Sequence, residues 1–128
     1  MDNYTLVRPE HLNHHGVLFG GVMLKWVDEF AWLTASRDFS HCTLVTIAMD
    51  DIQFRQRVPS GSILRFRILP LKQGFTSVRY TVDVFSDEPG SDEEKKVFST
   101  TVTFVRVDES GRKTPLPANP RFRSKSNE

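Results

Sequence analysis

A glycine pair followed by an apolar segment holds the residues of this chain whose types and spacing could do chemistry. Gly20 and Gly21 directly precede the apolar segment 22–35, and Asp28 lies inside that segment. Glycine lets another group come close to the backbone, and the first N–H groups of a helix have no partner within the helix. Asp28 would follow about two turns further along the same helix. This layout suits a carbonyl group that is polarised by backbone N–H groups and attacked by water.

The segment 22–35 is expected to form the one long helix of the chain, closed by Arg37 and Asp38. Its apolar residues cover nearly every side of a helix, and its charged residues share one stripe with Trp32 and Ser36. We therefore expect other structure to wrap this helix. The charges within it, and a length below the roughly 20 apolar residues that cross a bilayer, argue against a membrane anchor.

Five segments with strand character accompany the helix. A short β-prone run at 4–7 precedes it, and segments at 43–54, 62–69, 77–84 and 97–107 follow it, separated by turn residues. The pair Asp50 and Asp51 predicts a bulge or bend in the first segment after the helix. This order predicts an α+β fold in which a curved antiparallel β-sheet wraps around one long central α-helix. A sheet edge left open favours pairing with a second copy.

Length and composition limit the remaining possibilities. The 128 residues fit one domain, over 1–109, and residues 110–128, rich in Pro, Ser, Arg and Lys, are expected to form a mobile C-terminal tail. A formal net charge of +1 argues against general nucleic-acid binding. The single cysteine, Cys42, excludes an internal disulfide and a zinc site of several thiolates, and favours a reducing compartment. Residues 1–6 lack the basic and apolar regions of a secretory signal, so we expect a cytoplasmic protein.

Each candidate residue also has an ordinary structural interpretation. On spacing alone, Asp28 would be a solvated helix residue and Asn13 a turn former. The arginines of the strands would form a solvated sheet face. The four histidines lie in polar loops without an ordered set of ligands around them, so we expect no metal site: His11, His14, His15 and His41.

A longer motif changes the weight of these interpretations. Asn13-His14-x-Gly16-x-x-Phe19-Gly20-Gly21-x-x-Leu24-x-Trp26-x-Asp28-Glu29 resembles the signature of the hotdog-fold acyl-CoA thioesterases. Later blocks fall where that family has its own, so the similarity covers roughly residues 4–107. These blocks are Val45-Thr46, Asp51-Ile52-x-Phe54, Val58-x-x-Gly61 and Gly74-x-Thr76-Ser77.

The resemblance implies a hotdog fold that hydrolyses fatty acyl-CoA to free fatty acid and coenzyme A, without a metal or a cofactor. Asp28 would be general base for water or direct nucleophile, and the sequence does not choose between these roles. Gly20 and Gly21 would polarise the thioester carbonyl. Asn13 would come from the neighbouring subunit to position water or substrate. The catalytic unit would then be a homodimer, assembled further into a hexamer or a tetramer.

The chain departs from the family pattern where coenzyme A is expected to bind. The resemblance assigns Gly74, Thr76 and Ser77 to that contact, but Phe75 stands where the family usually has an arginine. Arg55 and Arg57 are therefore the candidates for the nucleotide phosphates, because the guanidinium group offers a fork of donors.

Two other functions stay open at the level of the sequence. A hotdog-fold hydratase or dehydratase acting on an enoyl thioester would use a histidine for proton transfer, and His14 or His15 could supply one. A non-catalytic acyl-CoA sensor would bind the same ligand without cleaving it. Only hydrolysis releases free coenzyme A, so a thiol-release assay separates the three.

Overall fold

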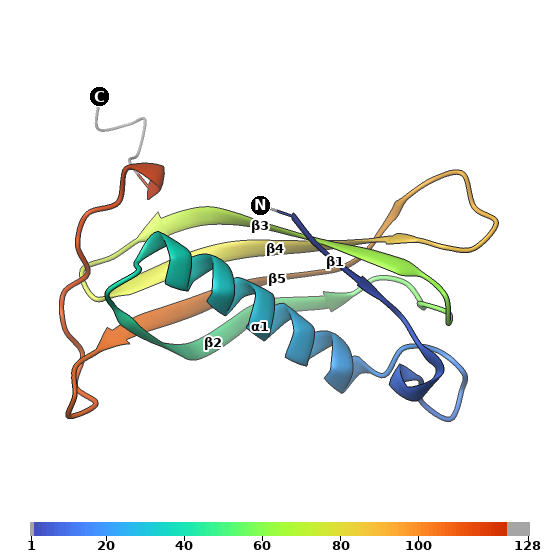
Figure 1. Cartoon of the computed structure of the whole chain (residues 1–128), viewed down its shortest axis with the longest axis horizontal. Coiled ribbons are helices and arrows are strands. Elements are labelled where there is room, and N and C mark those ends of the chain that lie inside the picture. The colour runs from blue at the N-terminus through green and yellow to red at the C-terminus, as the bar shows by residue number, and fades with distance from the viewer. Residues whose placement is uncertain (1, 123–128) are drawn as a thin grey trace.

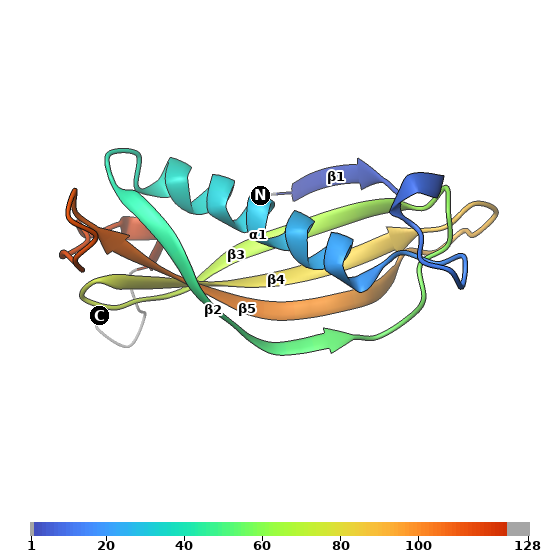
Figure 2. The ribbon, with the colours of Figure 1, turned by 90° about the horizontal axis from the view of Figure 1, so that it is seen from below.

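The computed structural model describes residues 2–122, which form one antiparallel sheet with one long helix across its concave face (Figures 1 and 2). The elements follow in the order β1 (Asp2–Leu6), η1 (Pro9–His11), α1 (Gly20–Asp38), β2 (Thr43–Phe54), β3 (Ile63–Gln73), β4 (Ser77–Asp87), β5 (Lys95–Val107) and η2 (Pro120–Phe122). The strands are ordered β1-β3-β4-β5-β2, so β1 and β2 are the two edges. The predicted α+β fold is confirmed. No helix of the described residues is long and apolar enough to cross a membrane.

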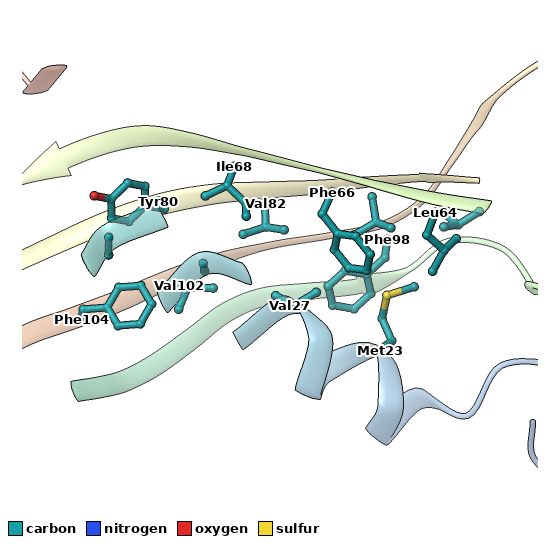
Figure 3. Packing of buried hydrophobic residues seen from close by; sticks show 14 of the residues in the cluster. Met23, Val27, Leu64, Phe66, Ile68, Tyr80, Val82, Phe98, Val102 and Phe104 are labelled. Atoms are coloured by element: carbon teal, nitrogen blue, oxygen red, sulfur yellow. The ribbon is translucent and has the colours of Figure 1, made fainter. Parts of the chain in front are cut away.

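The core lies between α1 and the three central strands, and it follows from the alternation of apolar residues in β3, β4 and β5. Phe66 pairs with Val84, and Val84 pairs with Phe98, so these fully buried side chains share the face that meets the helix. Met23 and Val27 of α1 pack onto them (Figure 3). This packing holds the helix at a fixed position over the sheet.

The helix is wrapped on one side only, which corrects the expectation that this chain would surround it. Five buried residues face the sheet, whereas Trp32 and Leu33 stay 43% and 49% exposed. A single sheet of five strands covers only one side of a helix. The edge strand β2 adds Val45 and Ile47, which are 44% and 52% exposed. The uncovered side of α1 and the edge strand β2 therefore each expose apolar groups.

The predicted bulge in β2 is confirmed. Asp51 has a positive φ of 54°, and the register of β2 against β5 shifts between Asp50 and Gln53. Three other strands are longer than predicted: β3 continues to Gln73, β4 to Asp87, and β5 already begins at Lys95. Residues that break the apolar alternation extend the ladders of the two hairpins, among them Pro70, Lys72 and Asp87.

The C-terminal segment packs on the domain, in contrast to the expected mobile tail over 110–128. The Leu116 N–H donates to the Phe75 carbonyl over 2.9 Å. The ring of Phe122 packs against Tyr80 and Phe39, with centroids 5.4 and 5.9 Å apart. Two apolar anchors inside a polar segment thus hold residues 113–122, called the C-terminal strap below. Residues 123–128 lie outside the described part.

Candidate functional site

The carboxylate of Asp28 lies at the seam between α1 and the edge strand β2. The Thr46 hydroxyl donates to its Oδ1 over 2.6 Å, and the side chain is partly buried. A distance this short is typical of a hydroxyl bound to a charged carboxylate. One oxygen of Asp28 is thus fixed by β2, and the carboxylate has a defined orientation. The sequence predicts no role for Thr46, although Val45-Thr46 is one of the blocks that resemble the family. The sequence feature that could have pointed to Thr46 is a polar residue two positions after the buried Leu44, on the inward side of the strand.

The helix begins at Gly20, two residues before the apolar segment. Phe19 precedes it in an extended conformation and gives no side-chain cap, and the first bonds run from the Val22 and Met23 N–H groups to the Phe19 carbonyl. The N–H groups of Gly20 and Gly21 lie before these bonds and have no acceptor within the helix. They stand at the positive end of the helix dipole, where a developing negative charge is stabilised.

The two glycines at the helix start have aromatic neighbours. A Cβ added at Gly21 would lie 2.7 Å from the exposed Phe19 ring, which would have to move, whereas one added at Gly20 would make an ordinary van der Waals contact of 3.4 Å with the ring of Phe54. Phe54 in turn packs on the buried Phe98, with ring centroids 4.9 Å apart. The backbone donors therefore have a fixed aromatic neighbour.

Asn13 lies in the loop before α1 and acts as a turn former. Its Oδ1 accepts from the backbone N–H groups of His15 and Val17, at 2.9 and 3.4 Å. The loop is tied to the helix start because the Phe19 N–H donates to the His11 carbonyl over 2.9 Å. These two hydrogen bonds use the Oδ1 of Asn13 and leave its Nδ2 amide group free to donate to another molecule.

The predicted coenzyme A contacts fall at two ends of the molecule. Arg55 follows β2 near the helix start, where its guanidinium donates to the Ser99 hydroxyl at 3.3 and 3.1 Å, and Arg57 is exposed in the same connection. The turn from Gly74 to Ser77 joins β3 to β4, closed by a 2.7 Å bond from the Gly74 N–H to the Ser77 carbonyl. The Arg106 N–H holds the Thr76 carbonyl at 2.9 Å.

The β3–β4 turn lies at the C-terminal end of α1 (Figure 1). The C-terminal strap connects the two, since Leu116 binds the Phe75 carbonyl and the Asn119 amide donates to the Asp38 carbonyl over 2.8 Å. Helix α1 has 19 residues, which at 1.5 Å per residue gives a length of about 28 Å. The structure therefore brings Arg55 towards Gly20 and Gly21, but it keeps Gly74, Thr76 and Ser77 far from them within one chain.

A shallow depression of about 350 Å³ opens beside the carboxylate, lined by Asp28, Glu29, Trp32 and Leu33. It combines one oriented carboxylate with apolar walls. Among residues 2–122, no three His, Cys, Asp or Glu side chains are grouped so that they could hold a metal ion. The described residues offer an oriented carboxylate at Asp28 and unpaired backbone donors at Gly20 and Gly21, about 10–12 Å apart along the axis of one helix.

Comparison with known proteins gives a consistent family. The model of the thioesterase superfamily matches residues 15–93. Mouse acyl-coenzyme A thioesterase 11 is 34% identical over 100 residues, which is 78% of this chain and 17% of the mouse protein. Other curated relatives are likewise longer, and the chain covers 64% and 63% of the next two. The chain thus spans less than two thirds of the curated relatives it matches first.

Solved structures agree in fold. HI0827, a hexameric broad specificity acyl-coenzyme A thioesterase, superposes with a TM-score of 0.81 at 27% identity, over 93% of this chain and 82% of that one. An acyl-CoA hydrolase from Staphylococcus aureus, in complex with butyryl coenzyme A and coenzyme A, gives 0.83 at 25% identity, over 92% and 71%. The single helix on a five-stranded antiparallel sheet is their hotdog arrangement, and this chain belongs to the thioesterase superfamily.

Proposed function

We propose that the protein hydrolyses acyl-coenzyme A thioesters to a free carboxylic acid and coenzyme A. The observation that carries the proposal is the carboxylate of Asp28, which Thr46 orients at 2.6 Å within a helix that begins with unpaired N–H groups at Gly20 and Gly21. The N–H groups would stabilise the oxyanion that forms when the carbonyl is attacked. As general base, Asp28 would take a proton from the water that attacks the carbonyl and pass it to the leaving thiolate. As nucleophile, it would form a mixed anhydride that water then hydrolyses, and the proton released in that step goes to the thiolate. In both routes the C–S bond breaks and the products are the carboxylic acid and coenzyme A.

The site is shared between two copies in this proposal. Eight residues separate Gly20 from Asp28, a rise of about 12 Å along the helix axis. A near-attack arrangement places the reacting atoms only about 3–3.5 Å apart. One helix therefore does not supply both the carbonyl donors and the carboxylate to a single substrate. A second copy, docked along the open edge of β2 and the exposed Trp32 and Leu33, would bring its own helix start to this carboxylate.

A homodimer is then the catalytic unit, with Asn13 also supplied across it. Further assembly into a hexamer is supported by HI0827, which is a hexamer. Binding of coenzyme A is supported by the staphylococcal complex. The turn at Gly74, Thr76 and Ser77 would reach the nucleotide from another copy, because it lies at the far end of its own helix. Arg55 and Arg57 are proposed for the phosphates.

Mixing two inactive variants tests the shared site. Asp28→Asn keeps the shape and the Thr46 contact of the side chain, and Asn13→Asp keeps the Oδ1 that holds the turn. Each variant alone should lose steady-state thiol release. After unfolding and refolding together, a two-fold dimer gives mixed pairs that carry one intact site, so about a quarter of wild-type activity should return. Activity that stays absent in the mixture would place both residues in one chain's site.

The same assay separates the alternatives. A hydratase or a sensor would release no thiol from saturated acyl-CoA, whereas the proposed enzyme does. The proposed mechanism draws only on a carboxylate and backbone donors, so dialysis against a chelator should leave turnover unchanged; loss of turnover that zinc or magnesium restores would contradict it. A cytoplasmic location is part of the proposal, since a reducing compartment suits the free thiol of Cys42.

A further inference from the structure

Trp32 is the aromatic side chain one turn after Asp28 on the same stripe of α1. The two residues are four positions apart, so they lie one above the other on the helix surface. The indole Nε1–H of Trp32 donates to the Leu44 carbonyl over 3.1 Å. Thr46 of the same strand binds Asp28. Strand β2 therefore fixes the carboxylate and the indole through two neighbouring inward positions.

The pinned indole forms an apolar wall on the side of the carboxylate that faces the C-terminus of α1. Long side chains on a helix lean towards its N-terminus, so the ring is directed towards the turn that carries Asp28. Trp32 is 43% exposed, and together with Asp28, Glu29 and Leu33 it lines the depression of about 350 Å³. Part of its ring surface is thus uncovered in the single chain, and in the proposed dimer the second copy and a bound acyl group would share it.

The distance between Asp28 and Trp32 limits the length of an acyl group that fits between the carboxylate and the indole ring. Four residues correspond to about 6 Å along the helix axis, which four or five carbon–carbon bonds of about 1.5 Å would span. A short acyl group attached to a thioester carbonyl at Asp28 ends within this space. A long acyl group entering it would meet the indole, which its hydrogen bond to the Leu44 carbonyl holds in place.

We propose that Trp32 sets the acyl-group preference of this protein by closing the acyl end of the site, so that short acyl thioesters are favoured over long ones. The inference rests on the proposed function for the position of the thioester at Asp28.

The test compares kcat/KM across acetyl-, butyryl-, octanoyl- and palmitoyl-CoA. The wild type should prefer the short substrates, and Trp32→Ala should raise the palmitoyl-to-butyryl ratio by at least about tenfold, since removing a wall changes apolar discrimination by such factors. Trp32→Leu, which leaves a smaller cavity, should shift the ratio in the same direction by less. Leu71→Ala is the control, at an apolar residue that is 49% exposed and lies outside the depression, and it should change the ratio by no more than about twofold.

Two results would overturn the inference: a wild type that prefers palmitoyl-CoA, or a ratio that Trp32→Ala and Trp32→Leu leave unchanged while both proteins stay folded. Binding of the same ligands to the Asp28→Asn variant, measured by calorimetry with and without Trp32→Ala, gives the ratio without turnover. A protein that releases no thiol but whose binding ratio shifts with Trp32 would refute the hydrolase proposal and support the wall. A protein that hydrolyses every substrate, and whose palmitoyl-to-butyryl ratio does not change in the Trp32 variants, would support the hydrolase proposal and refute the role of Trp32.

Discussion

Replacing Thr46 by valine removes the single hydroxyl that orients the Asp28 carboxylate and changes little else. Valine keeps the volume and the branched Cβ that suit a strand. The Thr46 Oγ1 to Asp28 Oδ1 distance of 2.6 Å marks a charge-assisted bond. Such bonds contribute about 1.5–3 kcal/mol. Asp28 is partly exposed, so water replaces part of the lost contact, and we expect a net loss near the lower end, about 1–2 kcal/mol.

If the lost free energy appears in the transition state, kcat/KM falls about 5–30-fold, because 1.4 kcal/mol is a factor of ten. The assay is continuous thiol release from butyryl-CoA, with the melting temperature followed in parallel to show that the fold is kept. Thr46→Ser is the control, since it retains the donor, and it should stay within about threefold of wild type. Equal activities of the valine and serine variants, with both proteins folded, would show that the bond does not orient a catalytic carboxylate.

Two further predictions concern stability. The buried Tyr80 hydroxyl donates to Asp38 Oδ2 over 2.7 Å, and burial with this bond raises the pKa of Tyr80 far above its ordinary value. Tyr80→Phe removes the donor to the Asp38 carboxylate and should lower the free energy of unfolding in urea by about 1–3 kcal/mol. Tyr4→Phe, at an exposed tyrosine, should change it by less than about 0.5 kcal/mol, and equal effects would contradict the role of this contact. The hydrogen bond from Arg65 lowers the pKa of Glu94 below its ordinary 4.5. This pair therefore stabilises the fold above that pH, and its contribution is lost as the pH falls through the lowered pKa. Urea unfolding should find the wild type more stable than Glu94→Gln at pH 7 and equal to it at low pH, and a difference in stability that persists in acid would contradict the assignment.

The order of elements, the inward face of β3 and the bulge at Asp50 and Asp51 could be predicted from the sequence. The spacing of apolar residues and the positions of turn residues depend directly on local backbone geometry. Through one motif the sequence also predicts Asp28, Asn13 and the glycine pair as site residues, and these roles stay predictions. It did not predict that Leu33 would be exposed, since periodicity shows that a residue is apolar but not whether its neighbours come from the same chain. Nor did it predict the C-terminal strap, where single anchors such as Phe122 are diluted by polar residues.

Several features that a single chain leaves exposed lie close together, and their position supports a site shared by two copies of the chain. The carboxylate of Asp28, the exposed Trp32 and Leu33, and the open edge of β2 all lie along the same side of the molecule. An electrostatic contribution to catalysis is largest where water is excluded, because charges are screened less there. One chain leaves this side in water. A second copy that extends the sheet at β2 would cover the exposed apolar residues and pair with the open backbone groups of this edge strand. The same contact would exclude water from the Asp28 carboxylate. Stability and activity would then depend on the same contact, and dilution below the dimer's dissociation constant should abolish both together.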